Sequence, residues 1–485
     1  MEKATGAPVI WWVRQDLRLG DNAALAAAAA TGAPVLPVFV FDDASAGAWA
    51  PGGASRWWLH HSLVALADAL RSRGLPLVLR RGDSRQLIPA IVEEVGAQAV
   101  FAGRMYEPWA RERDKAVAAA LAARGVRIEG ARTALLFEPW DIRTRTGGSY
   151  GVYTPFSRAC FNAAPPPQPK PAPARLIPPN HVPASDRLEA WRLLPTKPDW
   201  AGGLQTTWRP GEAGAAARLK RFLREALPRY DTLRNRPDVP GTSGLSPYLH
   251  WGEISPSEVW HSALAAGAAH AVPTESFLKE LIWREFSYHL LWHRPEMPHV
   301  PLKPLFSRFP WRNDPVALKA WQRGRTGYPI VDAGMRELWH TGWMHNRVRM
   351  ITASFLIKHL LIPWQEGEAW FWDTLVDADL AANSASWQWV AGCGADAAPY
   401  FRIFNPVLQG EKFDPQGAYV RRWVPELARL PAALIHRPWE ASPLVLAEAG
   451  VVLGRTYPLP IVEHAEARAR ALAALEAISA EKGAA

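Results

Sequence analysis

The sequence predicts a two-domain fold, in which an α/β N-terminal domain with a Rossmann-like parallel sheet is joined by a long linker to a larger all-α domain. Short apolar runs alternate with helical patterns over the first 140 residues, which is typical of a parallel sheet covered by helices on both faces. A proline-rich stretch follows, and beyond about residue 210 only helical patterns remain. We place the domains at 1–135 and 206–485, with the linker at 136–205.

The N-terminal elements can be assigned in chain order. The apolar run at 8–13 is the first strand, Asp21-Asn22 caps an Ala-rich helix, and Val35 to Phe41 is a second buried strand. Further elements follow as a helix at 55–73, a strand at 75–79, a helix at 84–95, a strand at 97–102 and a helix at 108–124. Residues 23–41 carry no charge, but two prolines and a Thr-Gly pair interrupt them, which favours a helix and a strand over a membrane span.

The linker and the second domain differ in pattern. The prolines at 163–183 exclude a regular helix or a central strand, so this segment is expected to be an extended connector. The predicted helices of the second domain are 213–227, 255–266, 274–292, 330–360 and 365–376.

Composition narrows the class of protein. The net charge of +9 favours a polyanionic partner, although many basic proteins bind no nucleic acid. Two cysteines, Cys160 and Cys393, do not suffice for a disulfide framework. His289 and His293 have the spacing of a zinc helix but lack the accompanying Glu and a third ligand, so we expect no metal. The N-terminus is a poor match to a signal peptide, and we expect a monomeric, cytoplasmic protein that binds no membrane.

Three segments carry side chains suited to a cofactor or a nucleic acid. Residues 230–247 contain glycines, small hydroxyls and a helix start near Ser246, which suit a pyrophosphate; an ordinary capped loop is the alternative. Glu280, Trp283, Arg284 and Ser287 form one polar stripe on an apolar helix, where a ligand contact competes with a simple Glu280–Arg284 ion pair. Asn346 and Met350 share a helix face that can accept the edge of a base. The alternative is an ordinary structural role, in which Met350 packs in the core and Asn346 lies at the surface.

Tryptophan is unusually abundant, at 25 residues. Trp387 and Trp389 are two apart, so on a helix they cannot face the same way. One can contact a redox centre while the other lines a cavity.

Together these segments resemble the DNA photolyase/cryptochrome family over nearly the whole chain. The resemblance rests on five ordered motifs: Trp12 to Asn22 (with Val13 where Phe is usual), Thr242-Ser-Gly-Leu-Ser-Pro247, Glu280-Leu-Ile-Trp-Arg-Glu-Phe286, Met344-His-Asn-Arg-Val-Arg-Met350, and Asp379 to Trp389. It implies an FAD in the helical domain and UV-damaged DNA as the partner.

The resemblance also implies roles for individual residues. The FAD contacts would be Tyr230, Thr242, Ser243, Leu245, Ser246, Arg349, Asp377, Asp379 and Asn383, with Asn383 beside flavin N5. An electron chain would run through Trp387, Trp364 and Trp311. The DNA contacts would be Trp283, Arg284, Asn346, Arg347, Met350 and Trp389, and Glu280, Asn346 and Asn383 would be catalytic.

The implied activity is light-driven splitting of cyclobutane pyrimidine dimers, most like the bacterial class III photolyases. A cryptochrome-type blue-light receptor and a (6-4) photolyase are the alternatives; Asn346 and Met350 stand where (6-4) enzymes carry histidines. Asn383 stands where plant cryptochromes usually carry Asp. Methenyltetrahydrofolate is the expected antenna, with Glu107 as a contact; a deazaflavin or no antenna is the alternative.

Overall fold

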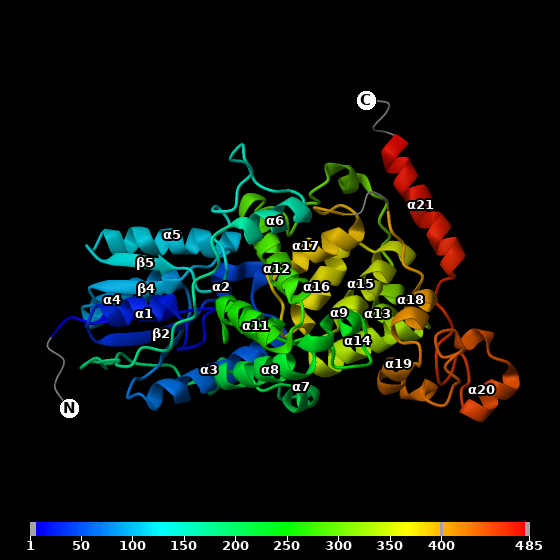
Figure 1. Cartoon of the computed structure of the whole chain (residues 1–485), viewed down its shortest axis with the longest axis horizontal. Coiled ribbons are helices and arrows are strands. Elements are labelled where there is room, and N and C mark those ends of the chain that lie inside the picture. The colour runs from blue at the N-terminus through cyan, green and yellow to red at the C-terminus, as the bar shows by residue number, and fades with distance from the viewer. Residues whose placement is uncertain (1–5, 398–400, 481–485) are drawn as a thin grey trace.

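The computed structural model describes residues 6–397 and 401–480. Within them, five parallel strands form one sheet in the order β3-β2-β1-β4-β5. The strands are β1 (Val9–Val13), β2 (Val35–Phe41), β3 (Val78–Arg81), β4 (Ala99–Gly103) and β5 (Arg127–Ala131). All strands lie at one end of the molecule and the helical part fills the other (Figure 1). The predicted fold class is confirmed.

Helices cover the sheet, and others build the second part. Around the sheet lie α1 (Ala23–Ala30), α2 (Asp43–Ala46), α3 (Gly53–Arg71), α4 (Ser84–Val95) and α5 (Pro108–Ala122). Beyond it follow α6 (Tyr153–Asn162), α7 (Gly202–Thr207), α8 (Glu212–Glu225), α9 (Tyr230–Leu233), α10 (Ser246–His250), α11 (Pro256–His270), α12 (Glu275–His293), α13 (Pro315–Gln322), α14 (Pro329–Thr341), α15 (Asn346–Ser354), α16 (Trp364–Thr374), α17 (Leu380–Ala391), α18 (Pro406–Phe413), α19 (Ala418–Trp423), α20 (Pro443–Ala449) and α21 (His464–Ala480). No helix of the described ranges has the length and apolar character to span a bilayer.

The structure differs from the predicted elements in several places. Helices α13, α18, α19 and α20 were not among the predicted helices. The predicted strand at 75–79 lies at Val78–Arg81 instead. The predicted helix at 330–360 is divided, because Gly342 takes a left-handed φ of 66° and ends α14, and His345 then caps α15. Strand β5 was not predicted: it is an edge strand with little burial, so it lacks the apolar run that marks the others.

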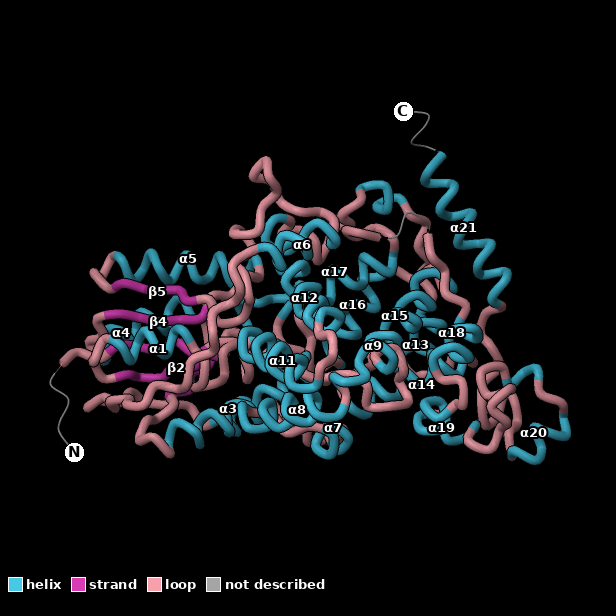
Figure 2. Tube along the Cα trace, viewed as in Figure 1, coloured by secondary structure: helices cyan, strands magenta, loops and turns pink. Residues whose placement is uncertain are grey.

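The connector at 163–187 contains no helix or strand and runs beside the sheet as an irregular trace (Figure 2). Its Ile177 carbonyl accepts a hydrogen bond from the first residue of β2 (2.8 Å). The wider 136–205 segment is not wholly irregular, because α6 and the start of α7 lie within it.

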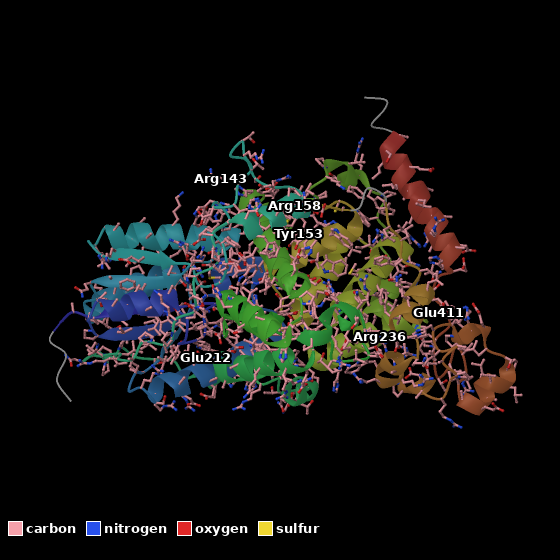
Figure 3. The ribbon with its side chains drawn as sticks, viewed as in Figure 1. Arg143, Tyr153, Arg158, Glu212, Arg236 and Glu411 are labelled. Atoms are coloured by element: carbon pink, nitrogen blue, oxygen red, sulfur yellow. The ribbon has the colours of Figure 1, made fainter. Side chains whose placement is uncertain are left out.

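The N-terminal motif ties the two parts together. Arg18 is 1% exposed, and its guanidinium donates to the carbonyls of Gly252, Asp21 and Thr133, each at 2.8 Å. The Glu212 carboxylate accepts the backbone N–H groups of Leu19 and Gly20, both at 2.9 Å; Figure 3 labels Glu212 at this junction.

We predict that Arg18→Leu lowers the free energy of unfolding by about 3 kcal/mol, because three carbonyls, two of them in buried hydrogen bonds, lose a charged donor. Urea unfolding measures the change, and Arg187→Leu, at a side chain that is 87% exposed, is the control. Equal stability of the two variants would contradict the prediction.

Candidate functional site

The loop before α10 has the backbone and side chains that a pyrophosphate needs. Gly241 is required because a Cβ there would lie 2.5 Å from the Leu233 carbonyl oxygen, and Gly244 takes a φ of 61°. The Arg218 guanidinium lies 3.5 Å from the position of a Cβ on Gly244. Hydroxyls, loop N–H groups and a cation therefore meet where Thr242, Ser243, Leu245 and Ser246 were predicted to hold phosphates. Tyr230, also predicted there, is buried against the Phe277 ring.

A chain of contacts connects this loop to an ion pair on the other side of the site. The Trp343 indole N–H donates to Ser246 Oγ (3.2 Å), and the Arg349 guanidinium lies 5.9 Å from the centre of the Trp343 ring. Arg349 in turn binds the Asp377 carboxylate at 2.8 Å. Two of the implied FAD contacts, Arg349 and Asp377, are therefore paired with each other; their contact with a flavin stays a prediction.

Asp379 is buried at the start of α17. One carboxylate oxygen caps the helix through the Ala382 N–H (2.8 Å), and the other accepts the Tyr288 hydroxyl (2.5 Å) and lies 3.5 Å from His250 Nδ1. Burial by itself raises the pKa of Asp379, but the hydrogen bond and charge of His250 outweigh it, with help from Arg284 and Tyr288, and lower the pKa to about 2. This carboxylate is a fixed negative charge at neutral pH.

Asn383 lies one turn further along α17. Its amide nitrogen donates to the Glu368 carbonyl (3.0 Å), and the neighbouring Ser384 hydroxyl binds the Glu368 carboxyl. Burial raises the pKa of Glu368 to about 8, so this acid is neutral in neutral solution. The Asn383 side chain is thus held in one orientation, and its carbonyl oxygen makes no hydrogen bond within the described residues.

These residues fit a flavin dinucleotide. The glycine loop with Arg218 suits two phosphates, while a half-buried ion pair, a fixed carboxylate and an oriented carboxamide suit the edge of a polar ring.

The three predicted electron-transfer tryptophans pass from core to surface. Trp387 and Trp364 are 2% and 1% exposed, and both belong to the second hydrophobic core. Gly367 on α16, one turn from Trp364, packs directly on the Trp387 ring. Trp311 is only partly buried, and the Arg312 N–H beside it donates to the Leu361 carbonyl (2.7 Å), just before Trp364. Trp389 points away from Trp387, as expected, and its indole N–H donates to the Asp396 carbonyl (3.1 Å).

The predicted lesion-binding side chains come from α12, α15 and α17, with α17 packed against the other two. Trp283, Met350 and Trp389 are partly exposed and Asn346 is exposed, as a contact surface requires. Glu280 forms an ion pair with Arg234. The intrahelical Glu280–Arg284 pair, which the sequence offered as the alternative to a ligand contact, is not formed. Burial raises the pKa of Glu280, although the charge of Arg234 opposes this.

Two of the predicted DNA contacts have partners within the protein. The Arg284 guanidinium donates to the Ala134 carbonyl (2.6 Å), and its side chain is 14% exposed. Arg284 thus joins the two parts of the chain, and its contact with DNA stays a prediction. Arg347 donates to the Asn235 side chain (2.8 Å) and stacks on Phe413, which leaves it only partly accessible.

Glu107 lies close enough to Asp379 and His250 for their charges to act on it. It is 4% exposed, precedes α5, and lines a cavity of about 90 Å³ at the edge of the sheet together with Trp12, Arg14, Met105, Trp109 and His250. Burial raises the pKa of Glu107.

Sequence reasoning missed several partners of the site residues. They are Arg218, Arg234, His250, Tyr288, Trp343 and Glu368. Arg234 lies inside the 230–247 segment that the sequence singled out, so its charge beside the small hydroxyls was an available signal. Glu368 has no such signal, because it is 15 residues from Asn383 along the chain.

The chain combines a parallel α/β part with a helical part that carries the glycine loop, the Arg349–Asp377 pair and the Asn383 carboxamide. This combination is typical of two-domain proteins that bind a nucleotide cofactor among their helices. The family model described as the FAD binding domain of DNA photolyase matches residues 277–477, and the DNA photolyase model matches residues 9–174. The chain belongs to the DNA photolyase/cryptochrome family.

Individual proteins of known name support the same family assignment. The chain is 53% identical to a deoxyribodipyrimidine photo-lyase from Agrobacterium fabrum, covering 97% of this chain and 98% of that protein. It is 39% identical to Arabidopsis thaliana cryptochrome-1, covering 96% of this chain and 70% of the relative. A bacterial class III photolyase from Agrobacterium tumefaciens superposes with a TM-score of 0.95 at 52% identity, and 99% of each chain is covered.

Proposed function

We propose that this chain is a light-driven deoxyribodipyrimidine photolyase, which splits cyclobutane pyrimidine dimers in DNA. The observation that carries the proposal is the gathering of Glu280, Trp283, Asn346, Met350 and Trp389 on three packed helices. The photolyase relative at 53% identity supports it over the cryptochrome at 39%. When bound and reduced, FAD supplies the photoexcited electron that opens the cyclobutane ring.

The side chains of the chain itself bind and orient the damaged bases. A dimer is extruded from the duplex at less cost than an intact pair, because its stacking and pairing are already disturbed. Trp283 and Trp389 offer indole faces for stacking, and Asn346 offers a carboxamide to the base edges. Glu280, when protonated, donates a hydrogen bond to a dimer carbonyl as negative charge grows on it.

The protonation state of Glu280 predicts a pH dependence. Burial raises the pKa of Glu280 above its ordinary value, so the protonated donor persists to higher pH than for an exposed Glu and is lost as the pH rises through that pKa. Repair per absorbed photon at saturating DNA should fall with rising pH in the native protein. Glu280→Gln, which keeps a donor at every pH, should show a flat profile; a parallel fall in both would assign the titration to another group.

We propose methenyltetrahydrofolate as the antenna, with Glu107 as one contact. The cavity beside Glu107, at about 90 Å³, is smaller than the 300–1,000 Å³ typical of ligand sites, so a whole chromophore does not fit within it. Only one end of the chromophore would enter this cavity, beside the Glu107 carboxyl. Loss of a folate absorbance band from purified Glu107→Ala protein, with FAD retained, would support it.

The decisive test uses two oligonucleotides, one with a thymine cyclobutane dimer and one with a (6-4) photoproduct. The reduced protein should repair the first in light, leave the second unchanged, and repair neither in the dark. Repair of the (6-4) product would overturn the substrate assignment. FAD binding without any repair would favour the photoreceptor alternative.

A further inference from the structure

A groove of about 800 Å³ lies between α6 and the first turns of α12. Tyr153, Ser157, Arg158 and Phe161 line it from α6, and Glu275 and Lys279 line it from α12. Glu280 and Trp283 follow on the same helix, so the groove adjoins the proposed dimer site. Figure 3 shows Tyr153 and Arg158 near α6, with Arg143 on the same edge of the molecule.

Tyr153 connects the groove to Trp283. The two rings are parallel to within 3°, and their centres are 3.5 Å apart. The Tyr153 hydroxyl donates to the Lys279 carbonyl at 2.8 Å, which fixes the tyrosine on α12 one turn before the tryptophan. Tyr153 thus covers one face of the Trp283 indole, and the Trp283 side chain stays partly exposed.

The groove has the side chains of a nucleic-acid surface. Arg158 is exposed and makes no ion pair with any residue that the structure describes. Lys279 is paired with Glu275 at 2.7 Å, but both side chains are exposed, and such a surface pair is weak enough to exchange for a phosphate. Phe161 presents a partly exposed ring among these polar groups, which suits a sugar or an unstacked base.

We propose that this groove binds the DNA strand adjacent to the extruded dimer, and that Tyr153 is a positioning residue for Trp283. The inference rests on the proposed function. It adds two elements to the proposed dimer site: a contact between Arg158 and a DNA phosphate, and the Tyr153 ring stacked on Trp283. Arg158 contributes affinity that depends on salt and not on damage. Tyr153 contributes discrimination between damaged and intact DNA, because it holds the indole that a base stacks upon.

The first test measures binding of a duplex carrying one thymine dimer by fluorescence anisotropy over a range of salt concentrations. The logarithm of the association constant falls linearly as the logarithm of the salt concentration rises. Arg158→Gln should make this slope less steep by about 0.9, the value for one duplex phosphate contact. Arg124→Gln, at an exposed arginine following α5, should leave the slope unchanged. An unchanged slope in Arg158→Gln would overturn the groove assignment.

The second test separates Tyr153 from a general structural role. Tyr153→Leu should lower the affinity ratio of dimer-bearing to undamaged duplex roughly fivefold or more, with the salt slope and the FAD content unchanged. Tyr153→Phe keeps the stacked ring and should retain most of the ratio. An unaltered ratio in the leucine variant, or no rescue by phenylalanine, would remove the positioning role.

A short substrate distinguishes failure of this inference from failure of the proposed function. A dimer in a dinucleotide has no flanking strand to place in the groove, so Arg158→Gln should bind and split it as the native protein does. If the native protein splits neither this nor the duplex dimer, the proposed function is wrong. If Arg158→Gln is impaired on the dinucleotide as much as on the duplex, the groove assignment is wrong.

Discussion

Trp387→Phe is expected to suppress photoreduction of the oxidised flavin while repair by protein that is already reduced continues. A benzene ring holds its electrons more tightly than an indole, which raises the barrier for donation by several kcal/mol, and about 1.4 kcal/mol already slows a step tenfold. Trp387 is the predicted first donor, and it is buried beside Gly367 on α16, the helix that begins at Trp364. The loss of oxidised-flavin absorbance under blue light and an external reductant measures the effect.

A control separates the redox role of Trp387 from its packing. Trp321 is equally buried and packs against Trp387 with ring centres 6.2 Å apart, but it is not a member of the predicted chain. Trp321→Phe should therefore cost stability without stopping photoreduction. Normal photoreduction in Trp387→Phe would show that another route carries the electron.

Glu280→Ala is expected to lower repair per absorbed photon severalfold and to leave FAD bound. Removing one preorganised hydrogen-bond donor from a developing negative charge typically raises the activation free energy by about 3 kcal/mol. Ring opening then becomes slower, and return of the electron to the flavin without repair competes with it. FAD should stay bound because the Glu280 carboxyl pairs with Arg234, and neither with the glycine loop at 241–246 nor with the Arg349–Asp377 pair.

The ion pair with Arg234 calls for a matched variant. Arg234→Gln removes the positive partner but leaves the Glu280 carboxyl, and it should raise the pKa of Glu280 further, because the arginine opposes the effect of burial. Repair in this variant should persist to higher pH than in the native protein. If Glu280→Ala and the native protein had the same yield, the donor role would be excluded.

Local sequence determined much of this protein. Asn22 caps α1, the runs at Val9–Val13 and Val35–Phe41 are buried strands, and Gly241 and Gly244 occur where the loop needs them, since each of these depends on neighbours a few residues away. The spacing of Trp387 and Trp389 predicted their opposite directions for the same reason. The predicted roles of these residues toward FAD and DNA follow from the family motifs that carry them.

The tertiary structure decided which side chains meet. Sequence spacing allowed a Glu280–Arg284 pair within one helix, but Glu280 binds Arg234, 46 residues away, and Arg284 binds the Ala134 carbonyl, 150 residues away. The stack of Tyr153 on Trp283 joins α6 to α12 in the same way. Contacts of this kind depend on how helices pack and on burial of charge, and no periodicity along the chain encodes them. The sequence by itself therefore determined the fold class and the candidate residues, and packing alone decided their partners.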